Sequence, residues 1–581
     1  MIVNKISVLI GGEAGAGITR SGFLFAKACL RGGLHVFGTN DYQSLIRGGH
    51  NFYIVRVDTE EIYSQADTID LLLALNRETI LLHKDKLVHG GGIVYDGEEI
   101  ALNDEEMDRD DLKLYSVPLK RVVKELDGPL IMRNTVALGA TVAILSYDLE
   151  ILNAIVRDAF KPKVAELNLK AAKMGYDYAR EHHAEESTYR LERTSLAGKR
   201  WIFLTGNEAV ALGAIRAGCK FFAAYPMTPA TPLLHFMAPL DREYNMIVLQ
   251  AESEIAAINM TAGASFAGVR AMTATSGGGF CLMSEGLGMT AMTETPVVIM
   301  LAQRPGPSTG LPTYSGQGDL RFAIHASQGE FPRVVIAPGD VEECFYETMN
   351  AFNLAEKFQI PVLLITDKYL VESHGTAKLF DPNRIGIDRG LLLTADAYAG
   401  EEEYQRHKFT KNGVSPRATP GTRAAIVRTS ADEHVESGYT TDDAELTTKM
   451  TDKRFKKLDA LTKDLENYET TKLYGPRKAD VTILGWGSTK GPIREAMKLL
   501  GKESPTINYL QIVYLNPFPV ANVQKVLKSA KQTVVVENNK TSQLSSLIRE
   551  YLLMTVDHEI LKYNGRPFNP MELLQKIKEV L

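Results

Sequence analysis

The chain has 581 residues, a formal net charge of −6 and a pI near 6.1. Hydrophobic residues make up 45% and charged residues 23%, as in ordinary globular proteins, and at roughly 100–200 residues per domain we expect three or four domains. The acidic balance argues against a nucleic-acid binder, and no apolar run reaches the ~18 residues that a membrane-spanning helix needs. The N-terminal "MIVNKISVLIGG" is typical of a first strand and not of a signal peptide, so we expect a cytoplasmic protein.

The N-terminal region alternates between predicted strands and helices, which indicates an α/β layer. A glycine turn, "GGEAGAG", follows the first strand and opens a helix. Its glycines Gly12, Gly15 and Gly17 do not have the G-x-G-x-x-G spacing, so a dinucleotide site is not favoured. The strands are expected at Ile6–Ile10, Asn51–Val57, Leu71–Leu75, Gly92–Tyr95 and Leu112–Val117.

The middle region has a doubly wound pattern. Near-continuous apolar strands such as "VRAMTAT", "TPVVIMLAQ" and "PVLLITD" alternate with helices, as in a buried parallel sheet. Residues 370–475 are more polar and end in a predicted exposed helix near Ala444–Asn467, with charges of both signs. A third α/β region begins at "ADVTILGWG" and ends with "PMELLQKIKEVL". We predict α/β domains at residues 1–183, 201–375 and 476–581, with an extended excursion and linker at 376–475.

Four unusual loops follow strands of the middle region. They lie at Tyr225–Thr231, Gln250–Glu254, Ser276–Gly279 and Gln303–Thr313, and right-handed crossovers should bring them to one edge of the sheet, where α/β proteins bind ligands. Thr228, Glu254 and Arg304 can therefore meet around one crevice. Taken singly, each has a structural alternative: a helix cap, a carboxylate that favours the helix dipole, and a solvated loop residue.

The four loops are similar to a known family. "YPMTPAT" resembles the Y-P-I-T-P-S-S motif of the 2-oxoacid:ferredoxin oxidoreductases, and "TATSGGGFCLMSEGLGMTAMTETP", "AQRPGPSTGLPT" and "GVSPRATPG" resemble the alpha subunit of the 2-oxoglutarate type. "GGEAGAGI" and "YQSLIRGGHN" resemble its gamma domain, fused ahead of the alpha part, and "VVVENNKTSQLSSLIRE" resembles a transketolase C-terminal-like domain. The resemblance spans essentially the whole chain. Met227, Ala230, Thr231 and Gly278 depart from the wider pattern, which puts substrate preference in doubt and leaves the chemistry intact.

The resemblance implies three α/β domains: a gamma-type domain, a thiamine diphosphate pyrimidine-binding domain and a transketolase C-terminal-like domain. It also implies a reaction in which a 2-oxoacid, with 2-oxoglutarate as the best candidate, is decarboxylated to acyl-coenzyme A while ferredoxin is reduced. Glu254 would be the catalytic carboxylate on the cofactor's aminopyrimidine, and Thr228 and Arg304 would hold the substrate carboxylate. The cofactor contacts would be Tyr225, Pro226, Glu254, Gly277 and Gly278.

The chain resembles half of an active site. It has no G-D-G motif for the cofactor's diphosphate, and "ENN" at 537–539 lacks the context of that motif. Its four cysteines, Cys29, Cys219, Cys281 and Cys344, form no C-x-x-C pair, so we predict no metal site in this chain. A beta subunit is therefore expected to bring the diphosphate half, Mg²⁺ and a 4Fe-4S cluster, in a heterotetramer of two alpha–beta pairs.

Other residues carry weaker hypotheses. Gly15, Gly17 and Arg47 are candidate coenzyme A contacts, because a helix N-terminus with glycines can hold an anion. His50 fits a structural loop equally well, and His434 is interpreted as a loop contact because no second histidine is placed beside it in the sequence. The alternatives for the whole chain are a pyruvate or branched-chain 2-oxoacid substrate, a non-redox thiamine enzyme subunit of the transketolase kind, and a non-catalytic nucleotide-binding or scaffold protein.

Overall fold

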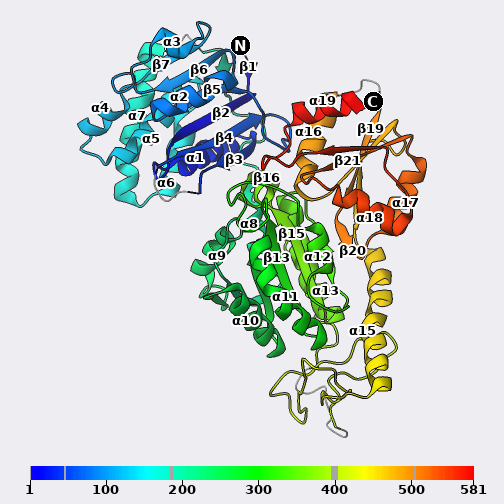
Figure 1. Cartoon of the computed structure of the whole chain (residues 1–581). Helices are drawn as coiled ribbons and strands as arrows, with labels where there is room; N and C mark the ends of the chain where they lie inside the picture. Colours follow the sequence, from blue (N-terminus) through cyan, green and yellow to red (C-terminus); the bar gives the residue numbers. More distant parts are fainter. Residues whose placement is uncertain (1, 45–47, 184–186, 394–402, 501–504, 581) are drawn as a thin grey trace. The chain divides into compact units, whose positions relative to one another are not determined.

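The computed structural model describes residues 2–44, 48–183, 187–393, 403–500 and 505–580. Its chain divides into two units, which are described separately below (Figure 1). The first comprises Met1–Leu204, Ser373–Leu379 and Asn569–Gln575, and the second comprises Thr205–Glu372, Phe380–Phe568 and Lys576–Leu581. Within the described ranges, no helix combines the length and the hydropathy that a bilayer crossing needs.

The first unit is built on an eight-stranded sheet in the order β7-β6-β5-β2-β4-β3-β16-β9. Strands β2, β5, β6 and β7 pair in parallel, whereas β4 pairs antiparallel with both β2 and β3. The elements are β1 (Ile2–Val3), β2 (Ile6–Glu13), α1 (Ile18–Arg31), β3 (His35–Asp41), β4 (His50–Asp58), β5 (Ile69–Ala74), α2 (Arg77–His83), η1 (Lys84–Lys86), β6 (Leu87–Tyr95), α3 (Asp104–Met107), β7 (Lys113–Ser116), α4 (Leu119–Glu125), η2 (Leu130–Met132), α5 (Arg133–Ile144), α6 (Leu149–Ala159), α7 (Pro162–His183), β8 (Tyr189–Arg190), β9 (Trp201–Thr205) and β16 (His374–Lys378).

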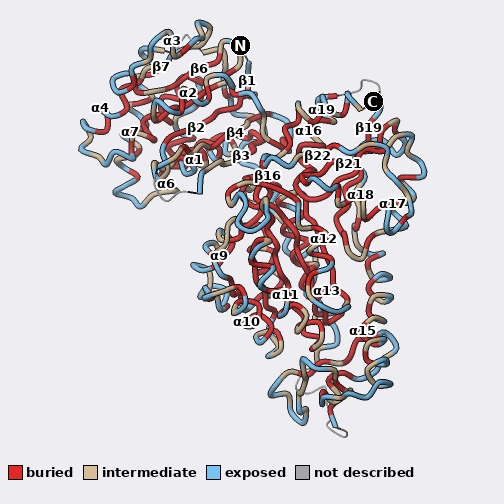
Figure 2. Tube along the Cα trace, viewed as in Figure 1, coloured by how far each residue is buried: buried red, intermediate tan, exposed pale blue. Residues whose placement is uncertain are grey.

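The alternation of side chains along β2 separates two cores in this unit. Val8 and Ile10 lie in a large cluster with apolar residues of α1, α5, α6 and α7, whereas Leu9 lies in a smaller cluster with Ile80 of α2. Successive side chains of a strand point to opposite faces, so the central strand has to be apolar on both. Figure 2 shows β2 and its neighbours buried along most of their length.

The second unit contains a seven-stranded sheet in the order β11-β10-β12-β13-β15-β14-β20. All its pairings are parallel except that of β14 with β20. Its elements are α8 (Gly206–Arg216), β10 (Cys219–Ala224), α9 (Thr231–Met237), η3 (Ala238–Leu240), β11 (Ile247–Gln250), α10 (Glu254–Phe266), β12 (Arg270–Thr275), α11 (Gly277–Met292), β13 (Val297–Gln303), α12 (Leu320–His325), β14 (Val334–Ile336), α13 (Val341–Phe358), β15 (Pro361–Asp367) and α14 (Lys368–Glu372).

A five-stranded sheet in the order β17-β19-β18-β21-β22 forms the rest of the second unit. Its core is continuous with that of the seven-stranded sheet, because Trp486 and Leu510 cluster with Ile258 and Leu301. The remaining elements of the chain are α15 (Ala444–Asp464), η4 (Leu465–Asn467), β17 (Thr471–Tyr474), β18 (Val481–Gly485), η5 (Gly487–Thr489), α16 (Lys490–Leu500), β19 (Ile507–Ile512), β20 (Tyr514–Asn516), α17 (Val520–Ser529), β21 (Gln532–Glu537), α18 (Gln543–Leu552), β22 (His558–Leu561) and α19 (Pro570–Val580). The first residues of α19 belong to the first unit.

The α/β class predicted from the sequence is confirmed, but the sheets exchange strands in ways that the sequence did not indicate. Strand β9 lies at the start of the predicted 201–375 domain and β16 crosses its predicted end, but both belong to the eight-stranded sheet of the first unit. Strand β20, from the predicted C-terminal domain, closes the edge of the seven-stranded sheet. Edge strands with unpaired backbone groups recruit such partners, and a pattern of hydrophobicity does not show which strand will pair there.

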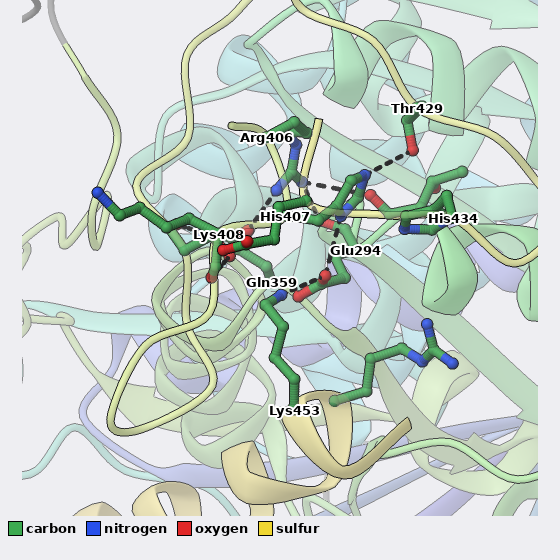
Figure 3. Close-up of polar contacts among 12 residues, drawn as sticks. Glu294, Gln359, Arg406, His407, Lys408, Thr429, His434 and Lys453 are labelled. Atoms are coloured by element: carbon green, nitrogen blue, oxygen red, sulfur yellow. Dashed lines mark hydrogen bonds and ion pairs between the residues drawn. The ribbon is translucent and has the colours of Figure 1, made fainter. Parts of the chain in front are cut away.

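Helix α15 was predicted to be exposed, and this is wrong for one of its faces. Lys453 and Lys457, one turn apart, are each only 1% exposed and reach the carboxylate of Glu294, which is also buried. Figure 3 shows Lys453 at this carboxylate. Lys453 Nζ lies 2.6 Å from Glu294 Oε1, and Lys457 pairs with Oε2. Burial alone would raise the pKa of Glu294, but the two ammonium groups hold it well below its usual value.

Two histidines complete this Glu294 cluster. His407 Nδ1 lies 2.9 Å from Glu294 Oε1, and the ring of His434 lies 4.0 Å from that of His407. His434 makes the predicted loop contact, from Nδ1 to the carbonyl of Asp432, but the expectation that no second histidine stands beside it is wrong. The ligand atoms of Glu294, His407 and His434 lie within 4.8 Å of one another. The ammonium groups of Lys453 and Lys457 already bind the carboxylate of Glu294. We therefore interpret the cluster as an ion pair that attaches α15, and not as a metal site.

The Glu294 cluster predicts a large effect on stability. Glu294→Gln leaves Lys453 and Lys457 buried without a carboxylate, so the free energy of unfolding should fall by about 3–5 kcal/mol, measured by urea denaturation. Burial lowers the pKa of Lys457 to about 7, below its unfolded value, so the folded state gains stability as the pH rises from 7 toward 10. Above pH 7 Lys457 loses its proton in the folded wild-type protein, so the ion pair that the variant lacks is weaker there. The loss of unfolding free energy caused by Glu294→Gln should therefore be smaller at pH 9 than at pH 7.

Glu445→Gln is the matched control, because Glu445 pairs with Lys449 on the exposed face of the same helix. It should change the unfolding curve little. Equal effects of the two substitutions would contradict the role of the Glu294 cluster as the anchor of α15.

Candidate functional site

The four loops predicted to gather do so at one edge of the seven-stranded sheet. The strands that precede them, β11, β10, β12 and β13, are adjacent and parallel, so their carboxyl ends lie at the same edge. Ligands of open α/β sheets bind outside this edge. The observed strand order therefore supports the prediction that the four loops lie close together.

The proline-rich loop after β10 is held by several contacts. Asn207, fully buried on α8, donates from Nδ2 to the carbonyl of Pro229 at 3.1 Å, and the amide of Ala230 donates to the carbonyl of Met227 at 2.8 Å. Prolines 226, 229 and 232 fix φ along the same stretch. Thr228 is thus held in a stiff loop, with its side chain half-buried.

Arg304 meets this loop directly. It follows β13 and donates from Nη1 to the backbone carbonyl of Thr228 at 2.8 Å. Burial lowers the pKa of its guanidinium, and among the described residues no carboxylate lies within ion-pair distance of it. A guanidinium has five N–H donors in a planar fork that suits a carboxylate. Arg304 is therefore positioned by one hydrogen bond and keeps further donors for an anion.

Glu254 is buried in an unusual way. It begins α10 after the N-cap Ser253, is 3% exposed, and its Oε1 has no hydrogen-bond partner among the described residues. A Cβ on Gly279 would lie 2.6 Å from that oxygen, so the carboxylate needs a glycine in the facing turn of α11. Thr275, the end of β12, contacts both this turn and the sulfur of Met227, 3.9 Å from its hydroxyl. Buried carboxylate oxygens rarely lack a donor, so this one indicates a ligand.

Gly277 and Gly278, the first two residues of α11, differ in their surroundings. Gly278 is exposed, and a Cβ there would meet only the carbonyl of Ser308 at 3.9 Å. Gly277 instead abuts the carboxylate of Asp319, whose Oδ2 has no partner among the described residues. Burial raises the pKa of Asp319 to about 6. Sequence reasoning missed Asp319, because an aspartate before a helix is ordinarily a cap, although its side chain makes no capping hydrogen bond.

The structure gives fewer contacts for the other residues that were predicted to bind the cofactor or coenzyme A. Tyr225 is 39% exposed and Pro226 is half-buried, both at the start of the proline-rich loop. In the first unit Gly15 and Gly17 have positive φ angles and precede α1, which lacks a side-chain cap, so their backbone conformation is sufficient reason for glycine. Arg47 lies outside the described residues. His50 is buried with its Nε2 2.8 Å from that of His83, as the structural interpretation expected.

An apolar face lies beside Glu254 on α10 and α11. Ile255 is 53% exposed, Leu282 50% and Met260 36%. Figure 1 shows the two helices next to each other, and they carry Glu254 and the glycine that faces its carboxylate. Contiguous exposed apolar residues mark interaction surfaces in soluble proteins.

Comparison with protein families identifies all three regions of the chain. Residues 212–453 match the family described as "Pyruvate flavodoxin/ferredoxin oxidoreductase, thiamine diP-bdg". Residues 7–178 match "Pyruvate ferredoxin/flavodoxin oxidoreductase", and residues 479–573 match "Pyruvate:ferredoxin oxidoreductase core domain II". The candidate site falls in the first of these ranges.

Curated relatives and a solved structure agree with this. The chain is 34% identical to a 2-oxoacid:ferredoxin oxidoreductase subunit alpha of Sulfolobus sp, over 99% of this chain and 97% of that protein. It is 33% identical to the 2-oxoglutarate synthase subunit KorA of Methanothermobacter marburgensis, over 64% of this chain and 98% of that one. A 2-oxoglutarate:ferredoxin oxidoreductase from Magnetococcus marinus, solved with 2-oxoglutarate, coenzyme A and succinyl-CoA bound, superposes with a TM-score of 0.90 at 35% identity and covers 99% of both chains.

The residues present fit the cofactor that this family binds. Glu254 offers a nitrogen donor a buried carboxylate oxygen that has no partner among the described residues, and Gly279 faces that oxygen without a side chain. Arg304 and the proline-rich loop lie at the same edge of the sheet and are joined by the hydrogen bond from Arg304 to the carbonyl of Thr228. The chain belongs to the family of 2-oxoacid:ferredoxin oxidoreductase alpha subunits, with a gamma-like domain ahead of the thiamine diphosphate-binding region.

Proposed function

We propose that this chain supplies the aminopyrimidine half of an active site that oxidises 2-oxoglutarate to succinyl-coenzyme A and carbon dioxide, with ferredoxin as the electron acceptor. The observation that carries the proposal is the buried, unpartnered Oε1 of Glu254 opposite Gly279. Of the groups that could fill this position, a protonated ring nitrogen is a donor of the right kind. The oxidoreductase class comes from the family, and the substrate and site roles are the proposal.

Glu254 acts on the cofactor by holding a proton. Thiamine diphosphate supplies the reactive carbon, and the protein supplies orientation and electrostatics. The buried carboxylate would accept a hydrogen bond from the aminopyrimidine ring nitrogen, and such a bond is stronger in a buried position than in water. Thr275 and Gly279 set the carboxylate's place, because a larger residue at position 279 would collide with it.

Arg304 and Thr228 hold the substrate's 1-carboxylate. The guanidinium, fixed by the carbonyl of Thr228, presents its remaining donors toward the crevice. Proline-locked loops hold such groups within the ~0.5 Å that catalysis requires. Substrate orientation is thus a property of this chain.

The apolar face formed by Ile255, Met260 and Leu282 supports a partner subunit at the site. It borders the half-site, so a subunit that covers it would also close the crevice over Glu254. We propose that this beta subunit brings the diphosphate-binding residues, Mg²⁺ and the 4Fe-4S cluster, and that the complex is a cytoplasmic heterotetramer. Coenzyme A is proposed to approach the gamma-like domain near Gly15 and Gly17.

2-Oxoglutarate is favoured over pyruvate and branched-chain 2-oxoacids by the Magnetococcus marinus and Methanothermobacter marburgensis relatives, whose names specify it. The test is an assay of the chain, co-purified with its beta subunit, on a panel of 2-oxoacids with coenzyme A and a one-electron acceptor dye. The highest kcat/KM should belong to 2-oxoglutarate, and a clear preference for pyruvate would overturn the substrate assignment. Turnover by this chain without a partner would overturn the half-site.

Glu254→Gln should lower kcat by about 10²–10⁴-fold, the range typical of a lost proton-handling group. The amide keeps the shape of the side chain and loses the charge that holds the proton. Dye reduction in the assembled complex measures the effect. The control is Glu252→Gln, which changes an exposed carboxylate two residues away and should leave the rate unaltered. Full activity of the Glu254 variant would remove the main support of the proposal.

Arg304→Lys should lower kcat/KM for the 2-oxoacid by about 10- to 100-fold, since charge-assisted hydrogen bonds contribute roughly 1.5–3 kcal/mol. The KM for coenzyme A should not change, because only the oxoacid carboxylate is affected. Arg384→Lys, in an exposed ion pair with Glu342, serves as the control. A parallel rise in both KM values would show that Arg304 does not act on the oxoacid specifically.

A further inference from the structure

The loop that begins with Arg304 continues to Asp319, and its second half is buried although it has no regular secondary structure. Thr313, Ser315 and Gln317 are 3%, 5% and 0% exposed. A buried loop needs partners for its backbone groups. Those partners come from the region of the five-stranded sheet, which no step of the proposed mechanism uses.

Gln317 is the centre of this contact, because its backbone and its side chain both bind that region. Its amide N–H donates to the carbonyl of Asn538 at 2.8 Å, and its carbonyl accepts from Asn539 Nδ2 at 3.2 Å. Its side-chain Nε2 donates to the carbonyl of Trp486 at 2.9 Å, and Oε1 accepts from the amide of Asn538 at 2.9 Å. A fully buried, fully satisfied amide of this kind specifies one geometry.

The "ENN" sequence is thereby explained without a metal. Glu537 Oε1 accepts from Asn539 Nδ2 at 2.9 Å and from Trp486 Nε1 at 2.8 Å, while its Oε2 accepts from the amide of Leu544 at 2.9 Å. Glu537 therefore orients Asn539 and Trp486, two of the three residues that Gln317 binds. We refer to Gln317, Trp486, Asn538 and Asn539 as the clamp.

A second contact supports the same stretch of loop. The amide of Ser315 donates to the carbonyl of Gly565 at 3.0 Å, and the guanidinium of Arg566 lies 3.8 Å from the centre of the Tyr314 ring. Asn538 Nδ2 donates to the carbonyl of Arg566 at 3.2 Å, which joins this contact to the clamp. Residues 314–317 of the loop are therefore held by contacts with the five-stranded region.

Hydrogen bonds at the two ends of the loop connect the clamp to Arg304. The amide of Asp319 donates to Oε1 of Gln303 at 2.9 Å, and Gln303 Nε2 donates to the carbonyl of Thr366 at 3.0 Å. Gln303 is fully buried and directly precedes Arg304. The two ends of the loop are therefore tied together, and the clamp fixes the segment between them.

We propose that Gln317 and Asn539 are positioning residues for the 2-oxoacid: the clamp holds the Arg304 loop in the geometry that binds the substrate carboxylate. The five-stranded region then has a defined role in catalysis although it contributes no group to the crevice. The inference rests on the proposed role of Arg304. It predicts that changes in the clamp act on oxoacid binding through Arg304 and not on every step alike.

The test uses Gln317→Leu and Asn539→Ala in the complex with the beta subunit. Because a misplaced binding group costs affinity steeply, each should raise the KM for the 2-oxoacid by about tenfold, while kcat and the KM for coenzyme A stay within about twofold. Combined with Arg304→Lys, Gln317→Leu should raise the KM little further, since coupled residues are not additive. The thermal midpoint of each variant shows whether it is folded.

Asn508→Ala is the matched control. Asn508 is 1% exposed in the same region and donates from Nδ2 to the carbonyl of Pro476 at 2.9 Å, but it does not touch the loop. It should leave the KM for the 2-oxoacid unchanged. An unchanged KM in folded Gln317→Leu and Asn539→Ala, an equal rise in the control, or additivity with Arg304→Lys would each overturn the positioning role.

Failure of this inference can be told from failure of the proposed function. If Arg304→Lys raises the KM and the clamp variants do not, the substrate role of Arg304 stands and the clamp is only structural. If Arg304→Lys itself leaves the KM unchanged, the proposed function is at fault.

Discussion

The site depends on the hydrogen bond from Arg304 to the carbonyl of Thr228, because it joins two loops that follow different strands. Parallel strands bring both loops to one edge of the sheet, and the hydrogen bond then fixes their relative position. The guanidinium is left with donors that face no carboxylate of the described chain. A guanidinium that is positioned by a backbone hydrogen bond and paired with no carboxylate of the described residues can bind an anionic substrate.

Several buried carboxylates of the second unit are paired with cations of the described chain, whereas Glu254 is not. Glu294 pairs with two lysines, Glu356 with Arg270 and Arg417, and Glu343 with Lys490 and Lys472. These pairs attach α15, the excursion and the five-stranded region to the seven-stranded sheet. Glu254 has no such cation among the described residues, and one of its oxygens has no partner. The ion pairs of Glu294, Glu356 and Glu343 compensate these charges within the chain, whereas we propose that Glu254 receives its hydrogen-bond donor from a ligand.

Much of this site could be predicted from the sequence. The loops after the strands, and Thr228, Glu254 and Arg304 within them, were identified from strand patterns and from the resemblance to a family. Asp319 and the clamp were not, since an aspartate before a helix and a glutamine in a loop have common structural explanations. The buried face of α15 was also missed, because Lys453 and Lys457 are charged and indicate exposure unless their partner is known.

The sequence by itself determined the α/β class, the order of the regions and the candidate site residues, because hydrophobic periodicity and local motifs are properties of neighbouring residues. Only the tertiary structure decided which strands cross between sheets, that the Glu254 carboxylate is buried with one oxygen lacking a partner among the described residues, and how residues 314–317 contact the five-stranded region. Each of these is a contact between segments far apart in the chain. Such contacts depend on the packing of the whole unit, which short-range patterns do not contain.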